Sequence, residues 1–157
     1  MSEIEAPEGT VRILDDQTVE VRLPSRFGCE RVAMECSASL AKRAGMVSER
    51  IEDLKTAVSE ACLNAMEHGN KGRPDAQVVV TMKHRKGAFS VTVKDEGKGR
   101  QEAPEEPDID RKLAERQTPR GLGVYLIRQL MDQVELDERT EEGHVIRMVI
   151  RLEQPSE

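Results

Sequence analysis

The sequence predicts an α+β fold, a two-layer sandwich in which helices cover one face of a mostly antiparallel mixed sheet. Segments with strand-like alternation come in pairs joined by short turns, and segments with helical periodicity are grouped between the pairs. Paired strands with grouped helices are typical of α+β domains. The 157 residues suit one domain with a hydrophobic core, so we expect a single domain over 1–157 in the order β-β-α-α-β-β-loop-α-β-β.

The first two elements are predicted as strands, VRILDD at 11–16 and TVEVRLP at 18–24, with a turn at 15–17. A helical pattern follows from about 25 to 44, and Gly45 breaks it. These residues predict a strand pair that leads directly into the first helix.

Ser48 is expected to be the N-cap of the second helix, because serine is a good capping residue. Glu49 and Glu52 then lie in the first turn, where the helix dipole favours negative charge. Gly69 ends the helix, and KGRPD at 71–75 is predicted as a loop.

Two strong strands follow, QVVVTMKH at 77–84 and AFSVTVKD at 88–95. The basic residues before Gly87 are best interpreted as the turn of a hairpin between these strands. VELDERT at 134–140 and HVIRMVIRL at 144–152 are predicted as the closing strand pair.

The segment 96–123 differs from the rest, because it is rich in glycine, proline and charge and poor in apolar residues. A connection of this length inside a compact domain is usually a functional loop. It has room for a short helical turn at about 109–116, and a helical stripe resumes at 124–132. The residues expected to face inward from that helix are Leu126, Ile127, Leu130 and Met131.

Two stripes run along the helix that contains SEACLNAMEHGN, residues 59–70. The apolar stripe consists of Leu54, Val58, Ala61, Cys62 and Ala65. The polar stripe, roughly opposite, consists of Glu60, Asn64, Glu67 and His68. A solvated face is the simplest interpretation of the polar stripe. Asn64 fits that interpretation least well, since asparagine is a poor residue for a helix interior.

Composition excludes several classes of function. The formal net charge of −6 and the presence of only three aromatic residues argue against nucleic-acid binding. No run approaches the roughly 18 apolar residues of a membrane span. The N-terminus is acidic and has no apolar stretch, so we expect no signal peptide and a cytoplasmic location.

The three cysteines, Cys29, Cys36 and Cys62, are odd in number and form no CxxC pair. They predict buried free thiols in a reducing compartment. The three histidines are scattered and show no spacing typical of a zinc site.

Two glycine-rich stretches bracket the long segment. DEGKG, 95–99, ends a predicted strand, where glycine lets the backbone turn and lets a flat ligand approach. RGLG, 120–123, opens a predicted helix, where free N–H groups suit a phosphate. Neither is a Walker loop, and each alone is equally compatible with a polar turn or an ordinary helix entry.

Taken together in this order, the Glu60-x-x-x-Asn64-x-x-x-His68 helix and the two glycine-rich stretches resemble the GHKL ATPase superfamily with its Bergerat ATP-binding fold. SEACLNAMEHGN resembles, within that superfamily, the bacterial anti-sigma factor serine/threonine kinases. The resemblance covers about residues 15–152, which sets the core of the domain. It implies an ATP- and Mg²⁺-dependent kinase that phosphorylates a STAS-type anti-sigma factor antagonist, sequesters a sigma factor and forms a homodimer.

The resemblance also implies roles for single residues. Glu60 matches the general base, and Asn64 matches the magnesium ligand. His68 matches a position that often holds a basic residue near phosphate, although a structural role at the helix end is equally compatible with it.

Asp95 matches the carboxylate that accepts a hydrogen bond from the adenine amino group, and Gly97 and Gly99 match the glycines against which adenine lies. Segment 96–120 matches the ATP lid. The residues matched to phosphate and nucleotide binding are Thr118, Arg120, Gly121, Leu122, Gly123 and Val124.

Two positions depart from the family pattern. Arg100 follows the first glycine-rich stretch, where the family usually has an apolar residue. His144 and Val145 follow Gly143, where the family often has threonine. These departures leave a second hypothesis open, a catalytically weak ATP-binding regulator of protein interactions.

Overall fold

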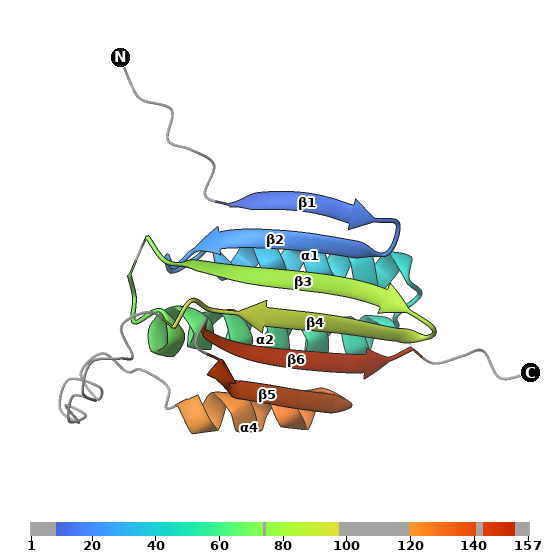
Figure 1. The fold of residues 1–157 in the computed structure, drawn as a ribbon. Coiled ribbons are helices and arrows are strands. Elements are labelled where there is room, and N and C mark those ends of the chain that lie inside the picture. Colours follow the sequence, from blue (N-terminus) through green and yellow to red (C-terminus); the bar gives the residue numbers. More distant parts are fainter. Residues whose placement is uncertain (1–8, 74, 98–119, 141–142, 153–157) are drawn as a thin grey trace, which may run out of the picture.

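This computed structural model describes residues 9–73, 75–97, 120–140 and 143–152, which form an open sheet with helices on one face (Figure 1). The elements are β1 (Thr10–Asp15), β2 (Thr18–Pro24), α1 (Glu30–Arg43), α2 (Ser48–Asn64), the π-helical turn η1 (Ala65–Gly69), β3 (Gln77–Arg85), β4 (Ala88–Lys94), α4 (Arg120–Leu130), β5 (Gln133–Thr140) and β6 (Gly143–Arg151).

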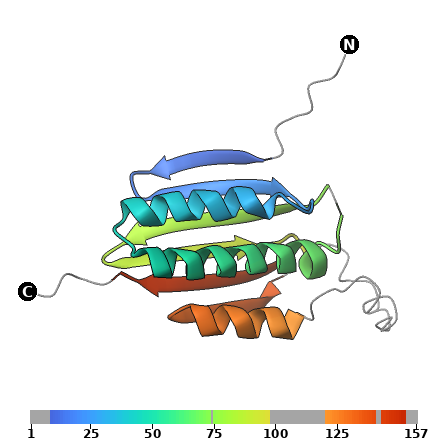
Figure 2. The ribbon, with the colours of Figure 1, turned by 180° about the vertical axis from the view of Figure 1, so that it is seen from behind.

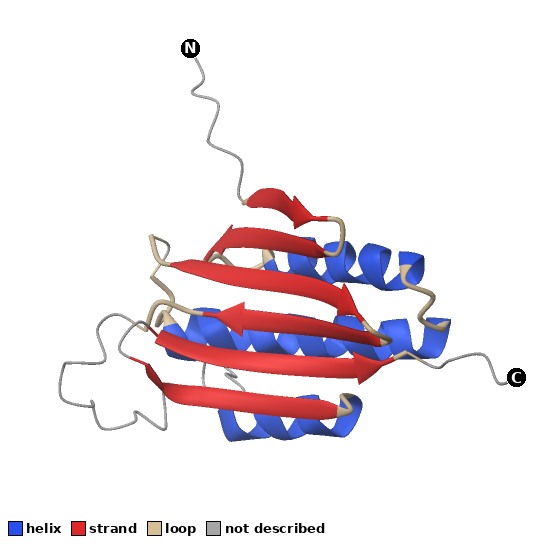
Figure 3. Ribbon diagram, turned by 45° about the vertical axis from the view of Figure 1, so that its right-hand side comes forward, coloured by secondary structure: helices blue, strands red, loops and turns tan. Residues whose placement is uncertain are grey.

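The strand order in the sheet is β1-β2-β3-β4-β6-β5, and each described pair of neighbours runs antiparallel. The helices lie on one face, as the view from behind shows (Figure 2). The opposite face of the sheet carries no helix among the described residues (Figure 3). The predicted α+β two-layer architecture and element order are therefore confirmed, with antiparallel pairing throughout the described strands.

The hairpin β3–β4 shows how local sequence sets this sheet. Alternate residues of both strands are buried against the helices: Val78, Val80, Met82, Phe89, Val91 and Val93. Lys86 and Gly87 join the strands with φ of 51° and 75°, the conformation that a two-residue turn of matching twist requires. The predicted basic hairpin turn is confirmed.

The apolar stripe of α2 forms the centre of the core. Its five predicted residues are all buried: Leu54, Val58, Ala61, Cys62 and Ala65. Burial, with the nearby Glu30 carboxylate, raises the pKa of the Cys62 thiol to about 12. All three cysteines are free, but Cys36 is only half-buried. No helix within the described residues combines the length and the apolar character that a membrane crossing needs.

Several predicted boundaries are wrong. α1 begins at Glu30 rather than near residue 25, because Gly28 adopts φ +103°, outside the helical region, and its N–H donates to the Glu30 carboxylate. Ser48 is the first residue of α2, and extended Val47 takes the N-cap position. α4 begins at Arg120, so the RGLG stretch forms its first turn.

The predicted burial of α4 is only partly correct. Ile127 and Met131 are buried and Leu130 is half-buried, but Leu126 is 39% exposed. The predicted lid and its helical turn at 109–116 lie almost entirely outside the described residues.

Candidate functional site

The polar stripe of α2 and η1 is not a freely solvated face. Glu60, Asn64, Glu67 and His68 are all half-buried. After Asn64 the helix widens into η1, where the Asn70 N–H donates to the Ala65 carbonyl, five residues back, at 2.8 Å. Such π-helical turns often occur at functional sites.

The first turn of α4 lies directly against this stripe at Gly123. A Cβ atom on Gly123 would lie 2.5 Å from Asn64 Nδ2 and 2.6 Å from Glu60 Oε1. Any larger side chain would therefore displace one of these two groups. The structure brings the predicted base, the predicted metal ligand and the predicted phosphate-binding segment to one place.

Asp95 follows β4 and is 4% exposed. A Cβ on Gly69 would overlap its side chain, and one on Gly143 would overlap its carbonyl oxygen. These two glycines therefore allow η1 and the start of β6 to close around Asp95.

The Asp95 carboxylate already has a partner in this structure. The backbone N–H of His144 donates to Oδ1 at 3.0 Å, and His144 Nδ1 lies 3.1 Å from both oxygens. In the tautomer that carries a proton on Nδ1, this nitrogen donates to the carboxylate. Sequence reasoning noted His144 as a departure but missed this contact.

A small cavity of about 20 Å³ joins the two halves of the site. Its polar lining consists of Asn64, Asp95 and His144, and Val124 of α4 also lines it. The metal-ligand candidate and the base-binding candidate thus face one cavity between the helices and the sheet.

Asn70, which the sequence analysis also missed, holds the exit of β4. Its buried Nδ2 donates to Ser25 Oγ at 2.7 Å and to the Gln77 carbonyl at 3.0 Å, while its Oδ1 accepts the Glu96 N–H at 2.8 Å. The sequence could have identified Asn70 by its position directly after Gly69, because the end of a helix needs polar partners.

The remaining predicted residues differ in how much of them the structure describes. Gly97 adopts φ +57°, and a Cβ on it would lie 2.8 Å from the Gly143 Cα, so this turn requires close approach of two chain segments. Leu122 is 57% exposed and Val124 is half-buried. Arg120 and Gly121 are described only as backbone of α4, and Gly99 and Thr118 lie outside the described residues.

The environment of Glu60 favours a base stronger than an ordinary carboxylate. Burial raises the pKa of Glu60, the Glu67 carboxylate raises it further, and His68 opposes the rise. Burial also raises the pKa of Glu67. A raised carboxylate pKa is typical of catalytic general bases.

The donor atoms here fit Mg²⁺ held largely by a nucleotide. Asn64 and Glu60 offer oxygen atoms side by side, the ligand type that Mg²⁺ prefers. Among the described residues, no three His, Cys, Asp or Glu side chains gather into a metal site. Phosphates and water would therefore have to complete the shell, as is usual for Mg²⁺.

Comparison with known proteins decides the family. A model of the histidine kinase-like ATPase domain matches residues 24–150. The chain belongs to this family. A serine-protein kinase RsbW from Listeria innocua is 35% identical over 125 residues, which cover 75% of this chain and 78% of that protein. The RsbW of Bacillus pumilus is 32% identical over 124 residues, with coverage of 75% and 76%.

Two other comparisons agree with the assignment of this chain to the histidine kinase-like ATPase family. An anti-sigma F factor from Halalkalibacterium halodurans is 30% identical over 96 residues, covering 56% of this chain and 60% of that protein. A crystal structure of the RsbU and RsbW domains of a Mycobacterium tuberculosis protein shares the fold, with a TM-score of 0.64 at 18% identity, over 88% of this chain and 33% of that chain. The predicted family and kinase class are confirmed, whereas the residue roles stay predictions.

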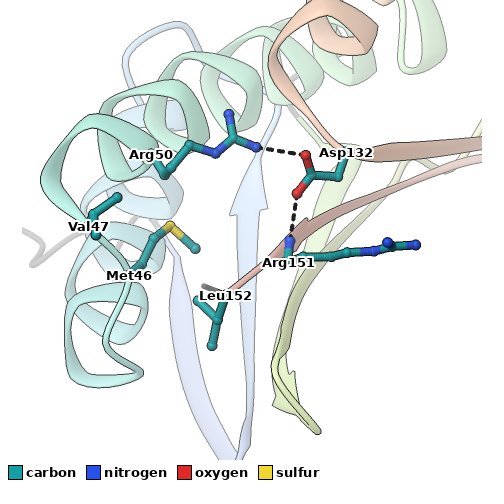
Figure 4. A pocket seen from close by; sticks show the side chains of 6 residues that line it. All are labelled: Met46, Val47, Arg50, Asp132, Arg151 and Leu152. Carbon is teal, nitrogen blue, oxygen red and sulfur yellow. Dashed lines mark hydrogen bonds and ion pairs between the residues drawn. The ribbon is translucent and has the colours of Figure 1, made fainter. Parts of the chain in front are cut away.

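A second and larger cavity, of about 440 Å³, lies at the opposite end of α2 (Figure 4). Arg50 Nη1 donates to the Leu130 carbonyl at 3.0 Å, and Nη2 lies 3.2 Å from Asp132 Oδ1. Asp132 Oδ2 also accepts the Arg151 N–H at 2.7 Å. Arg50 and Asp132 thus connect α2, the end of α4 and β6 beside this cavity.

Proposed function

We propose that this chain is an ATP-binding anti-sigma factor serine/threonine protein kinase. It phosphorylates a STAS-type anti-sigma factor antagonist and sequesters a sigma factor, and it acts as a homodimer. The names of its relatives, serine-protein kinase RsbW and anti-sigma F factor, support this proposal. Nucleotide state and antagonist phosphorylation decide which partner is bound, which requires partners with different affinities for the two states.

The observation that carries the proposal is the contact of Gly123 with Glu60 and Asn64. Catalysis of phosphoryl transfer rests mainly on positioning and charge neutralisation, so it needs a base, a metal ligand and a phosphate-binding segment together. The polar end of α2 and the first turn of α4 bring these candidates together. The N-terminus of α4 also presents the positive end of a helix dipole.

In the proposed reaction, the nucleotide supplies the phosphoryl group, and Mg²⁺, when bound, would neutralise the charge on its phosphates. Asn64 would hold the metal through its amide oxygen, and Asp95 would accept a hydrogen bond from the amino group of the base. Glu60 orients the substrate hydroxyl and takes its proton. The hydroxyl oxygen bonds to the γ-phosphorus, and the bond from that phosphorus to the oxygen of ADP breaks.

Calorimetric titration of ATP, with and without Mg²⁺, tests the binding part of the proposal. Wild type should bind ATP in a magnesium-dependent manner, and Asn64→Ala should lose that dependence together with most of the affinity. A wild-type protein that binds no ATP would contradict the proposal and favour a protein–protein adaptor.

Glu60→Gln tests the catalytic part. Phosphoryl transfer should fall by roughly 10²–10⁴-fold while ATP binding persists, because the amide cannot take a proton. An acid-stable phosphoprotein product would separate a serine/threonine kinase from a histidine kinase, since phosphohistidine is acid-labile.

A catalytically weak ATP-binding regulator is the second candidate. The His144 contact with Asp95 favours it, because the imidazole competes with a base for that carboxylate. Sigma-factor control that is unchanged in Glu60→Gln would support this candidate over the kinase.

A further inference from the structure

The register of β4 and β6 places His144 beside Asp95. Lys94 pairs with Val145 and Val93 with Ile146, so the next pair in this antiparallel ladder is Asp95 and His144. The Asp95 N–H accordingly donates to the His144 carbonyl at 3.1 Å. Both side chains point to the helix-covered face, where they are 4% and 5% exposed.

His144 engages both oxygens of the Asp95 carboxylate. Oδ1 accepts the backbone N–H at 3.0 Å and lies 3.1 Å from Nδ1, and Oδ2 lies 3.1 Å from the same nitrogen. A hydrogen bond to a charged group contributes more than a neutral one. A base that uses Asp95 must therefore compete with the imidazole.

The space beside the pair leads to the same conclusion. The cavity that His144, Asp95 and Asn64 line has a volume of about 20 Å³. A cavity of this size holds about one water molecule. While the imidazole keeps its present position, its Nδ1 occupies the place beside the Asp95 carboxylate that the amino group of a base would take.

We propose that His144 is a gate of the base site, and that a nucleotide base with an exocyclic amino group binds by displacing the imidazole from Asp95. This inference rests on the proposed function, in which Asp95 receives the base. The wild-type affinity for ATP therefore includes the cost of breaking the His144–Asp95 contact.

Calorimetry on His144→Thr tests the gate, with His84→Thr as the matched control on β3, outside this cavity. We expect His144→Thr to bind MgATP at least about tenfold more tightly than wild type, because a charge-assisted hydrogen bond no longer competes. His84→Thr should bind MgATP as wild type does. Equal or weaker binding by His144→Thr, with wild type binding normally, would overturn the gate and leave the proposed function standing. No binding by either protein would overturn both.

Inorganic tripolyphosphate separates a base gate from a general change in the site. It has no base, so its affinity should be the same for wild type and His144→Thr. An equal gain in affinity for tripolyphosphate and for ATP would overturn the inference, because His144 would then act on the phosphate end.

The wild-type protein gives a second test that does not depend on how the variant folds. Imidazole ¹⁵N–¹H spectra report the proton on His144 Nδ1 and its hydrogen bond. Saturation with MgATP should shift these signals as the contact with Asp95 breaks. Signals that stay unchanged at saturation would overturn the displacement of His144.

Discussion

Two carboxylates on one helical stripe, Glu60 and Glu67, determine how the proposed site responds to pH. The Glu67 charge raises the pKa of Glu60, so Glu67→Gln should lower it. A base acts only when deprotonated, and activity is therefore lost as pH falls through the pKa of Glu60. The Glu67→Gln variant should therefore retain phosphotransfer activity to a lower pH than wild type does.

The pH–rate profile of kcat/KM measures this shift directly. Glu52→Gln is the matched control, since Glu52 is an exposed carboxylate earlier on α2. Superimposable profiles for wild type and Glu67→Gln would show that Glu67 does not act on the base.

Adding a single methyl group at Gly123 should weaken the binding of MgATP. Alanine is favoured over glycine inside a helix by about 1 kcal/mol, so Gly123→Ala should not weaken α4 itself. Its Cβ would nevertheless lie 2.5 Å from Asn64 Nδ2 and 2.6 Å from Glu60 Oε1. We expect MgATP affinity to fall about tenfold or more, measured by calorimetry. Gln129→Ala, on an exposed part of α4, should leave affinity unchanged.

At the scale of the elements, the side chain of Asn70 links three segments of the chain. Its side chain joins the segment after β2, the start of β3 and the exit of β4 through three hydrogen bonds. Asn70→Ala leaves these buried partners unpaired and should lower the free energy of unfolding by about 3 kcal/mol. Ser25→Ala, which removes one of the three bonds, should cost about 1 kcal/mol. Urea denaturation compares the two, and equal losses would contradict the joining role of Asn70.

At the scale of the whole molecule, β1 is an edge strand of the sheet formed by the described residues. Ile13 is 78% exposed and Val11 is 55% exposed on this strand. An apolar edge strand readily pairs with another chain, which agrees with the predicted homodimer. Ile13→Lys should therefore shift the protein toward monomer in light scattering. A wild-type protein that is already monomeric at high concentration would contradict the dimer.

The fold could be predicted because the sequence patterns that indicate its elements are local. Alternation and two-residue turns specify the hairpins, and helical spacing places Glu60 and Asn64 on one stripe. Helix packing places Gly123 against that stripe, and cross-strand register places His144 beside Asp95. No local sequence pattern determines either of these two arrangements. The start of α1 was mispredicted because the conformation of Gly28 overrides helical periodicity.

The strand order has a consequence for how the chain can be divided. β1 to β4, α1 and α2 all precede residue 98, whereas α4, β5 and β6 all follow residue 119, and β6 lies directly against β4. Each half contributes to the candidate site, with Glu60, Asn64 and Asp95 in the first and Gly123 and His144 in the second. A protein cut between residues 98 and 119 should therefore behave as a complementing pair of fragments, whose reassembly nucleotide would promote by mass action.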